Sequence, residues 1–120
     1  MERIAFLLKA RPGYEEEYVR RHREVWPEVL ADMEKAGLHK MSIFMQGRDL
    51  FLYMEVENYA EASRILLKSP ESVRWEEYMT PILEDPAGGD YDPVNAFPDG
   101  LPEVFFWQAG EQGRGTNRSS

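Results

Sequence analysis

The sequence predicts an α+β fold in which an antiparallel sheet carries helices on one of its faces. Two observations lead to this prediction. Segments with the two-residue alternation of strands are interspersed with segments that have the helical period, and two of the strand-like segments are separated only by a hairpin turn. A chain of 120 residues fits one domain. We assign this domain to residues 1–108 and expect the polar, glycine-rich tail over 109–120 to be disordered.

The first strand is predicted over residues 3–10. Ile4, Phe6 and Leu8 alternate there with neighbours that are themselves largely apolar. A strand that is apolar on both faces is typical of the centre of a sheet that is covered on both sides. The Arg-Pro-Gly sequence at 11–13 ends the strand, because proline and glycine favour turns.

A long helix is predicted from about residue 14 to Gly37, which is a good helix stop. Three glutamates at 15–17 occupy its first turn, where the positive end of the helix dipole favours carboxylates. Pro27 lies inside the helical pattern, so we expect a kink or a short break at Trp26-Pro27. The apolar stripe of this helix consists of Tyr18, Val19, His22, Val25, Trp26, Val29, Leu30 and Met33.

Two further strands are predicted over residues 38–45 and 50–57, with a hairpin turn at 46–49 between them. One face of the first of these strands is expected to carry His39, Met41, Ile43 and Met45. The second presents an aliphatic face made of Leu50, Leu52, Met54 and Val56, and Phe51, Tyr53 and Glu55 point the other way.

Two helices follow these strands. The first is predicted over residues 59–67, and the second begins at Ser69-Pro70, with serine at the N-cap and proline at the first helical position. Residues 81–102 are rich in Pro, Gly, Asp and Asn and are predicted to be a long loop, a kind of segment that is usually functional or mobile. A last strand is predicted over residues 103–107.

The predicted order of elements is β-α-β-β-α-(α)-β, which best fits a ferredoxin-like fold, βαββαβ. Helices on one face leave the other face of the sheet uncovered, although its strands are apolar there as well. A second copy of the chain, packed sheet against sheet, would cover that face. We therefore expect a homodimer, in which the terminal strands could be shared.

Composition excludes several classes of function. The chain has 14 Lys and Arg against 22 Asp and Glu, a formal net charge of −8, which argues against nucleic acid and anionic membranes as partners. It has no run of apolar residues long enough to cross a membrane and no pattern typical of a signal peptide, so we predict a cytoplasmic location. With no cysteine, thiolate chemistry is excluded, and the two histidines lie 17 positions apart, so no metal site is predicted.

The residues that could carry chemistry lie on the long helix. Tyr18 and His22 are four positions apart on one helix face, and Trp26 continues the same row. The simplest interpretation is that they are core residues, with His22 a hydrogen-bonded core histidine. However, a helix break lies beside them, and the fold brings Trp75 to the same end. Aromatic walls with a few polar groups describe a small-ligand pocket, and they suit a sugar.

At these residues the sequence resembles the L-rhamnose mutarotases, over about residues 3–106. Residues 17–28 meet every fixed position of the family pattern E-Y-x-R-R-H-x-x-x-W-P-E. Residues 74–79 are similar to the family's R-W-W-x-Y-M, and residues 102–106 are similar to its closing strand.

The resemblance implies a dimeric α/β barrel that interconverts the α- and β-anomers of a 6-deoxy-L-hexose, with L-rhamnose as the first candidate and no metal or cofactor. It implies that His22 is the proton donor, and that the sugar is contacted by Tyr18, Met41, Trp75 and Glu76. Two of these positions depart from the family, which has tyrosine at Met41 and a second tryptophan at Glu76. L-fucose or another deoxy sugar therefore stays open as the substrate.

Two alternatives remain at this stage. The same fold hosts cofactor-independent monooxygenases and haem-degrading enzymes, in which a helical histidine and a tryptophan line the pocket; this alternative rests on analogy of fold alone. A non-catalytic sugar-binding protein is the other.

Elsewhere the simpler interpretation holds: His39 is predicted to be structural or on the surface, and Arg20 and Arg21 are predicted to make salt bridges or dimer contacts.

Overall fold

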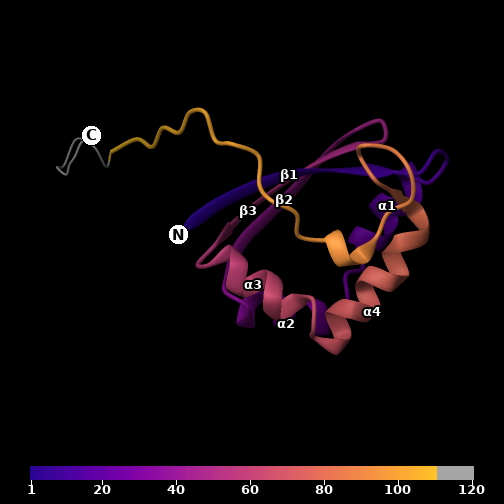
Figure 1. Cartoon of the computed structure of the whole chain (residues 1–120), viewed down its shortest axis with the longest axis horizontal. Helices are drawn as coiled ribbons and strands as arrows, with labels where there is room; N and C mark the ends of the chain where they lie inside the picture. The colour runs from indigo at the N-terminus through magenta and orange to yellow at the C-terminus, as the bar shows by residue number, and fades with distance from the viewer. Residues whose placement is uncertain (111–120) are drawn as a thin grey trace.

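The structure is a computed structural model of the chain, and it describes residues 1–110 (Figure 1). Four strands form one antiparallel sheet in the order β2-β3-β1-β4. They are β1 (Glu2–Ala10), β2 (Leu38–Gln46), β3 (Asp49–Val56) and β4 (Leu83–Glu84). The helices are α1 (Glu15–His22), α2 (Pro27–Lys35), α3 (Tyr59–Leu66) and α4 (Pro70–Met79). All four lie on one side of the sheet (Figure 1), so the predicted ferredoxin-like α+β fold is confirmed.

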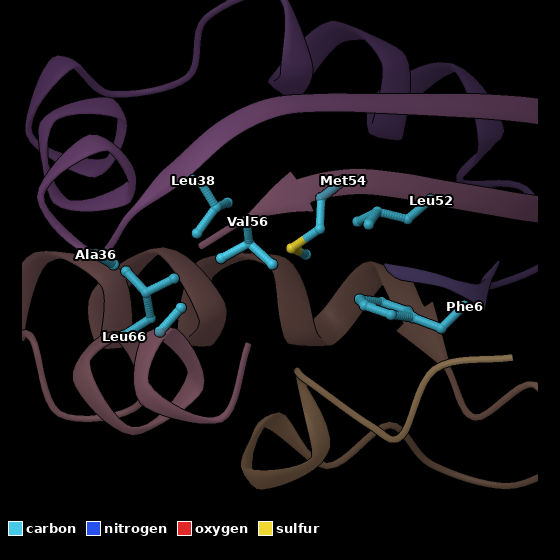
Figure 2. Close-up of a cluster of buried hydrophobic side chains, with 8 residues drawn as sticks. Phe6, Ala36, Leu38, Leu52, Met54, Val56 and Leu66 are labelled. Atoms are coloured by element: carbon cyan, nitrogen blue, oxygen red, sulfur yellow. The ribbon is translucent and has the colours of Figure 1, made fainter. Parts of the chain in front are cut away.

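The main hydrophobic core lies between the inner face of the sheet and the helices. The aliphatic face predicted for β3 is confirmed, because Leu50, Leu52, Met54 and Val56 are all buried. Figure 2 shows Met54 and Val56 from β3 beside Leu38 and Leu66, which belong to the same buried cluster. Burying side chains of this size contributes roughly 1.5–3 kcal/mol each. This layer of apolar side chains holds the helices against the sheet.

The predicted break at Trp26-Pro27 is confirmed and is longer than expected. α1 ends at His22, and α2 begins at Pro27. Trp26 is extended, with ψ at 135°, because the proline ring disfavours the helical conformation in the residue before it. Gly37 follows α2 with a positive φ of 97°, which confirms it as the helix stop. The one predicted helix is therefore two short helices, separated by residues 23–26.

The starts of α3 and α4 follow from local chemistry. Asn58 caps α3, and its side-chain oxygen accepts a hydrogen bond from the backbone N–H of Glu61 at 3.0 Å. α4 begins with Pro70 at its first position and Ser69 at the N-cap, as predicted, although the serine side chain makes no capping bond. Proline stabilises this start because its fixed φ suits the helix and it lacks an N–H that would need a partner.

Two predictions for the C-terminal part are wrong. The predicted loop over 81–102 contains β4, which pairs with β1, and a short 3₁₀ helix (Pro93–Asn95). Residues 103–107 form no strand in the described part of the chain, and Val104 is 94% exposed. A strand needs a neighbouring edge with free backbone groups. β4 pairs with β1 only at Lys9 and Ala10, and Leu101 donates a single backbone hydrogen bond to Ala5, at 2.8 Å. Residues 103–107 make no such bonds to the described residues, so they lack the ladder that defines a strand.

The outer face of the sheet is apolar, as the sequence predicts. Leu7 of β1 faces Phe51 of β3, and Phe51 in turn faces Phe44 of β2. These neighbouring side chains are 50%, 41% and 66% exposed, respectively. They form a row across three strands. Because they alternate with the buried side chains of the inner face, they lie on the opposite face, the one without helices (Figure 1).

The tail predicted to be disordered lies, from residue 111 onward, outside the described residues. Among residues 1–110, none of the helices has both the length and the apolar character that crossing a bilayer requires.

Candidate active site

A cavity of about 540 Å³ lies between the inner face of the sheet and the helices, among the described residues. Its size is within the range of small-molecule sites. Its wall includes all five residues singled out from the sequence, namely Tyr18, His22, Met41, Trp75 and Glu76. They come from three elements, α1, β2 and α4, so it is the fold that brings them together.

Aromatic rings form a continuous row at one side of the cavity. The rings of Tyr18 and His22 are stacked with centroids 4.3 Å apart, and His22 meets Trp75 edge-on at 5.7 Å. Trp26 packs edge-on against Trp75 at 5.2 Å. Trp26 therefore supports the wall from behind, and Trp75 is the tryptophan that lines the cavity. The extended conformation before Pro27 is what lets Trp26 reach this position.

His22 is held by its own helix. Its Nδ1 lies 3.0 Å from the backbone oxygen of Tyr18. Since a carbonyl oxygen only accepts, Nδ1 carries a proton in this arrangement, and Nε2 is the atom that can exchange a proton with a ligand. Burial lowers the pKa of His22, and the bond to Tyr18 offsets this effect only in part. Desolvation therefore outweighs the other influences on this group, which makes its protonated form a stronger acid.

Tyr18 is buried, and its phenol keeps its proton at any ordinary pH. Burial raises the pKa of the Tyr18 hydroxyl far above its usual value, and the negative charge of Glu76 raises it further. The hydroxyl is therefore a hydrogen-bond donor or acceptor for a ligand rather than a base.

Glu76 faces the cavity rather than solvent alone, which the sequence left open. Its Oε1 accepts a hydrogen bond from the hydroxyl of Tyr91, at 3.1 Å. Burial raises the pKa of Glu76, and the bond from Tyr91 partly opposes that rise. Tyr91, which was not predicted from the sequence, lies in the predicted 81–102 loop and also lines the cavity. The only signal was the unusual length of that loop.

Met41 lies on the sheet side of the cavity, at a site with a different character. Its neighbours on the same strand, Ile43 and Met45, also line the cavity, as does Met33 of α2. This side offers a ligand only aliphatic and thioether surface. The wall of the cavity thus combines polar and aromatic side chains with apolar ones.

His39 lies outside the cavity, in agreement with its predicted surface role. Its side chain is 47% exposed, and its Nε2 is 2.8 Å from the carboxylate of Glu57. The prediction that it shares a face with Met41 is wrong. The register of β2 shifts between Leu38 and Lys40, and such an irregularity changes the alternation of side chains.

Arg20 and Arg21 form salt bridges, as predicted, and both bind Glu17. The two guanidinium groups lower the pKa of Glu17 to about 2. Arg21 also reaches α4. Its Nη1 donates to the backbone oxygen of Tyr78 at 2.6 Å, and its guanidinium lies 3.9 Å from the centre of the Tyr78 ring. Arg21 therefore joins the helix that carries Tyr18 and His22 to the helix that carries Trp75.

We expect Arg21→Met to lower the free energy of unfolding by about 1–3 kcal/mol, because it removes charge-assisted hydrogen bonds while keeping most of the side-chain stem. Urea denaturation measures this change. Arg64→Met is the matched control, since Arg64 is 57% exposed and pairs with Glu61 within its own helix, α3. An equal and small loss for both variants would contradict the bridging role of Arg21.

Among residues 1–110, no three or more His, Asp and Glu side chains are arranged to hold a metal ion. The absence of a metal or cofactor from the reaction stays a prediction.

Comparisons with known proteins agree on one family. A family model described as L-rhamnose mutarotase matches residues 3–106. The L-rhamnose mutarotase of Opitutus terrae is 39% identical over 107 residues, which are 88% of this chain and 97% of that protein. The L-rhamnose mutarotase of Oceanobacillus iheyensis is 34% identical over 107 residues, with 88% and 97% covered.

A solved structure agrees with these relatives. The crystal structure of an L-rhamnose mutarotase from Formosa agariphila superposes with a TM-score of 0.70 at 25% identity, covering 90% of this chain and 100% of that chain. These relatives are mutarotases rather than the monooxygenases and haem-degrading enzymes that the fold alone left open. With the motif around His22 placed in the wall of a cavity, the chain belongs to the L-rhamnose mutarotase family.

Proposed function

We propose that this protein is a mutarotase, an isomerase that interconverts the α- and β-anomers of a 6-deoxy-L-hexose, with L-rhamnose as the first candidate. The observation that carries the proposal is the cavity in which His22, Tyr18 and Trp75 lie together, in a chain of the mutarotase family. The names of the relatives support L-rhamnose as the substrate.

The two kinds of side chain in the cavity wall suit the two kinds of surface of a deoxy sugar. Trp75 offers an aromatic face for the C–H groups of the ring, and Tyr18 offers a hydroxyl partner for the sugar hydroxyls. The apolar lining at Met41 and Ile43 suits the methyl group that distinguishes a 6-deoxy hexose. In this proposal Glu76 is also a sugar contact.

The reaction requires a proton to move at two oxygens. The ring oxygen O5 gains a proton while the anomeric hydroxyl O1 loses one. The C1–O5 bond then breaks, and C1 and O1 form the carbonyl of the open-chain aldehyde. Rotation about C1–C2 presents the other carbonyl face, and the reverse steps close the ring as the other anomer. We assign the proton donor for O5 to Nε2–H of protonated His22, because burial lowers its pKa and so makes the protonated form a stronger acid, and its Nδ1 is fixed by Tyr18.

Saturation-transfer NMR of the anomeric protons tests the proposal. With a catalytic amount of protein, we expect faster exchange between the anomers of L-rhamnose, measured beside L-fucose and D-glucose. D-glucose carries a hydroxyl on C6, which would lose its hydration against the apolar lining. If anomer exchange is not accelerated for any aldose, but the NMR signals of a sugar broaden because it binds, the protein would instead be a non-catalytic sugar-binding protein.

We also propose that the protein acts as a homodimer. Support comes from the row of Leu7, Phe51 and Phe44 on the outer sheet face, and from residues 104–107, which are apolar and largely exposed. Apolar surface of this extent is typically covered by a partner. A second copy packed sheet against sheet would cover it, and the segment around residues 103–107 could then be shared between subunits.

Sedimentation velocity at micromolar concentration is expected to give the mass of a dimer. Phe51→Lys should shift the protein toward the monomer, because it places a charge in the centre of the apolar row. Val94→Lys is the control, since Val94 is also exposed but lies in a 3₁₀ helix away from the sheet. A parent protein that sediments as a monomer would contradict the proposal.

Residues 1–108 are proposed to be one domain, in keeping with the family match over residues 3–106. A cytoplasmic location stays part of the proposal, and cell fractionation would test it.

A further inference from the structure

The proposed reaction needs a second group that removes the proton from the anomeric hydroxyl. The titratable side chains in the cavity wall are Tyr18, His22, Arg23, Glu76 and Tyr91. His22 is assigned to the ring oxygen, and an arginine does not give up its proton in proteins. Both phenols have pKa values raised far above neutrality by burial and by the charge of Glu76. Within the described part of the chain, Glu76 is the one carboxylate in this wall.

Glu76 is held in place by a residue from a distant part of the chain. Tyr91 lies in the segment between β4 and the Pro93–Asn95 helix, and its hydroxyl donates to Oε1 of Glu76 at 3.1 Å. This bond occupies one carboxylate oxygen and leaves Oε2 for a ligand. The rest of the residue is fixed as well, because Thr80 Oγ1 donates to the backbone oxygen of Glu76 at 2.6 Å.

We propose that Glu76 is the general base that takes the anomeric proton, and that Tyr91 is the positioning residue that orients and ionises it; this inference rests on the proposed function. The family pattern has tryptophan at this position, so the base is a property of this chain's own residues.

The proton balance closes with these two groups. In ring opening, the Glu76 carboxylate takes the proton from O1 while protonated His22 gives one to O5, and the C1–O5 bond breaks as C1=O1 forms. In ring closure, neutral His22 takes the proton back from O5, and Glu76 returns its proton to O1. Both groups end as they began, so no further reactant is needed.

The charge environment of Glu76 supports this role. Burial raises the pKa of Glu76, and the hydrogen bond from Tyr91 lowers it. The other titratable groups near this pair are Tyr18, His22, Arg23 and Asp92. A carboxylate whose pKa is raised toward neutrality is a more effective base than an ordinary one, provided that it is still ionised at the working pH. The hydrogen bond from Tyr91 favours its ionised form.

Removing the Tyr91 hydroxyl therefore has a predicted direction. A base works only when deprotonated, so activity falls as the pH drops through its pKa. In Tyr91→Phe the lowering effect is lost, and the pKa of Glu76 rises. The acidic limb of the pH profile should move to higher pH by about half a unit or more. A purely structural role for Tyr91 would lower the rate at all pH values and leave the limb where it is.

The experiment compares pH profiles of anomer exchange for the parent, Tyr91→Phe and Glu76→Gln. We expect Glu76→Gln to lose about tenfold or more of the rate across the profile. Tyr59→Phe is the matched control, because Tyr59 also donates a side-chain hydrogen bond, to the backbone oxygen of Pro98 at 2.6 Å, but does not line the cavity. Its profile should keep the parent's limb.

A second measurement is independent of the rate. Titration of ¹³C-labelled glutamate carboxyls by NMR, with Glu76→Gln to assign the signal, should show a higher pKa for Glu76 in Tyr91→Phe than in the parent. Two outcomes would overturn this inference while leaving the proposed function in place, provided that the parent is active. In one, Tyr91→Phe has its acidic limb at the same pH as the parent; in the other, the rate of Glu76→Gln is within about twofold of the parent's. A parent that accelerates exchange of no aldose would overturn the proposed function, and the inference with it.

Discussion

His22→Ala is expected to lower the rate of anomer exchange by about 10²- to 10⁴-fold, the usual loss when a general acid is removed. The effect should be large because His22 is the one histidine in the cavity wall among the described residues, and its Nδ1 is already bound to Tyr18. Since burial lowers its pKa, the protonated form that donates to the ring oxygen is lost as the pH rises through that lowered value. Activity that depends on it should therefore fall on the alkaline side.

Saturation-transfer NMR measures this loss, and circular dichroism checks that the variant is folded. His39→Ala is the matched control, because His39 is exposed and pairs with Glu57 away from the cavity. It should keep the parent rate. An unchanged rate in His22→Ala would remove His22 from the reaction, whatever the substrate.

Trp75→Ala is expected to cost about 3–5 kcal/mol in the free energy of unfolding, the range for removing a buried aromatic side chain. Trp75 is only 8% exposed, and its ring contacts the rings of His22, Trp26 and Tyr78. The same substitution removes the aromatic wall of the cavity, so sugar binding should weaken as well. Urea denaturation and a sugar titration measure the two effects.

Two further variants separate stability from binding. Met54→Ala should destabilise by about 2–5 kcal/mol without touching the cavity wall. It should keep the parent affinity for sugar at temperatures where it is folded. Trp75→Phe keeps a ring and should retain more affinity than Trp75→Ala. If Met54→Ala weakens sugar binding as much as Trp75→Ala, the wall has no specific role.

Much of the fold could be predicted from local patterns. The aliphatic face of β3, the breaks at Pro27 and Gly37, and the start of α4 at Pro70 all follow from neighbouring residues. The spacing of apolar residues and the effect of proline on the backbone depend on only a few neighbouring positions, so the elements that they define can be predicted from the sequence. The motif around His22 could also be recognised, because its residues lie within twelve consecutive positions of the chain.

The errors share a physical cause. Residues 103–107 have the composition of a strand, but a strand also needs a ladder of backbone hydrogen bonds to a neighbouring strand, and in the described structure this segment makes none. The register shift near His39 arises in the pairing of β2 with β3. No pattern along one segment contains this information, because it depends on residues far away in the sequence.

The sequence by itself determined the α+β class, the apolar faces and the family resemblance, because each depends on residue types at short, regular spacings. Only the tertiary structure decided which side chains meet. It set Trp26 behind Trp75, joined α1 to α4 through Arg21, and brought Tyr91 within 3.1 Å of Glu76, fifteen positions earlier in the chain. These contacts depend on how the helices pack on the sheet and on the path of the segment after β4, and packing is a property of the whole chain rather than of any segment.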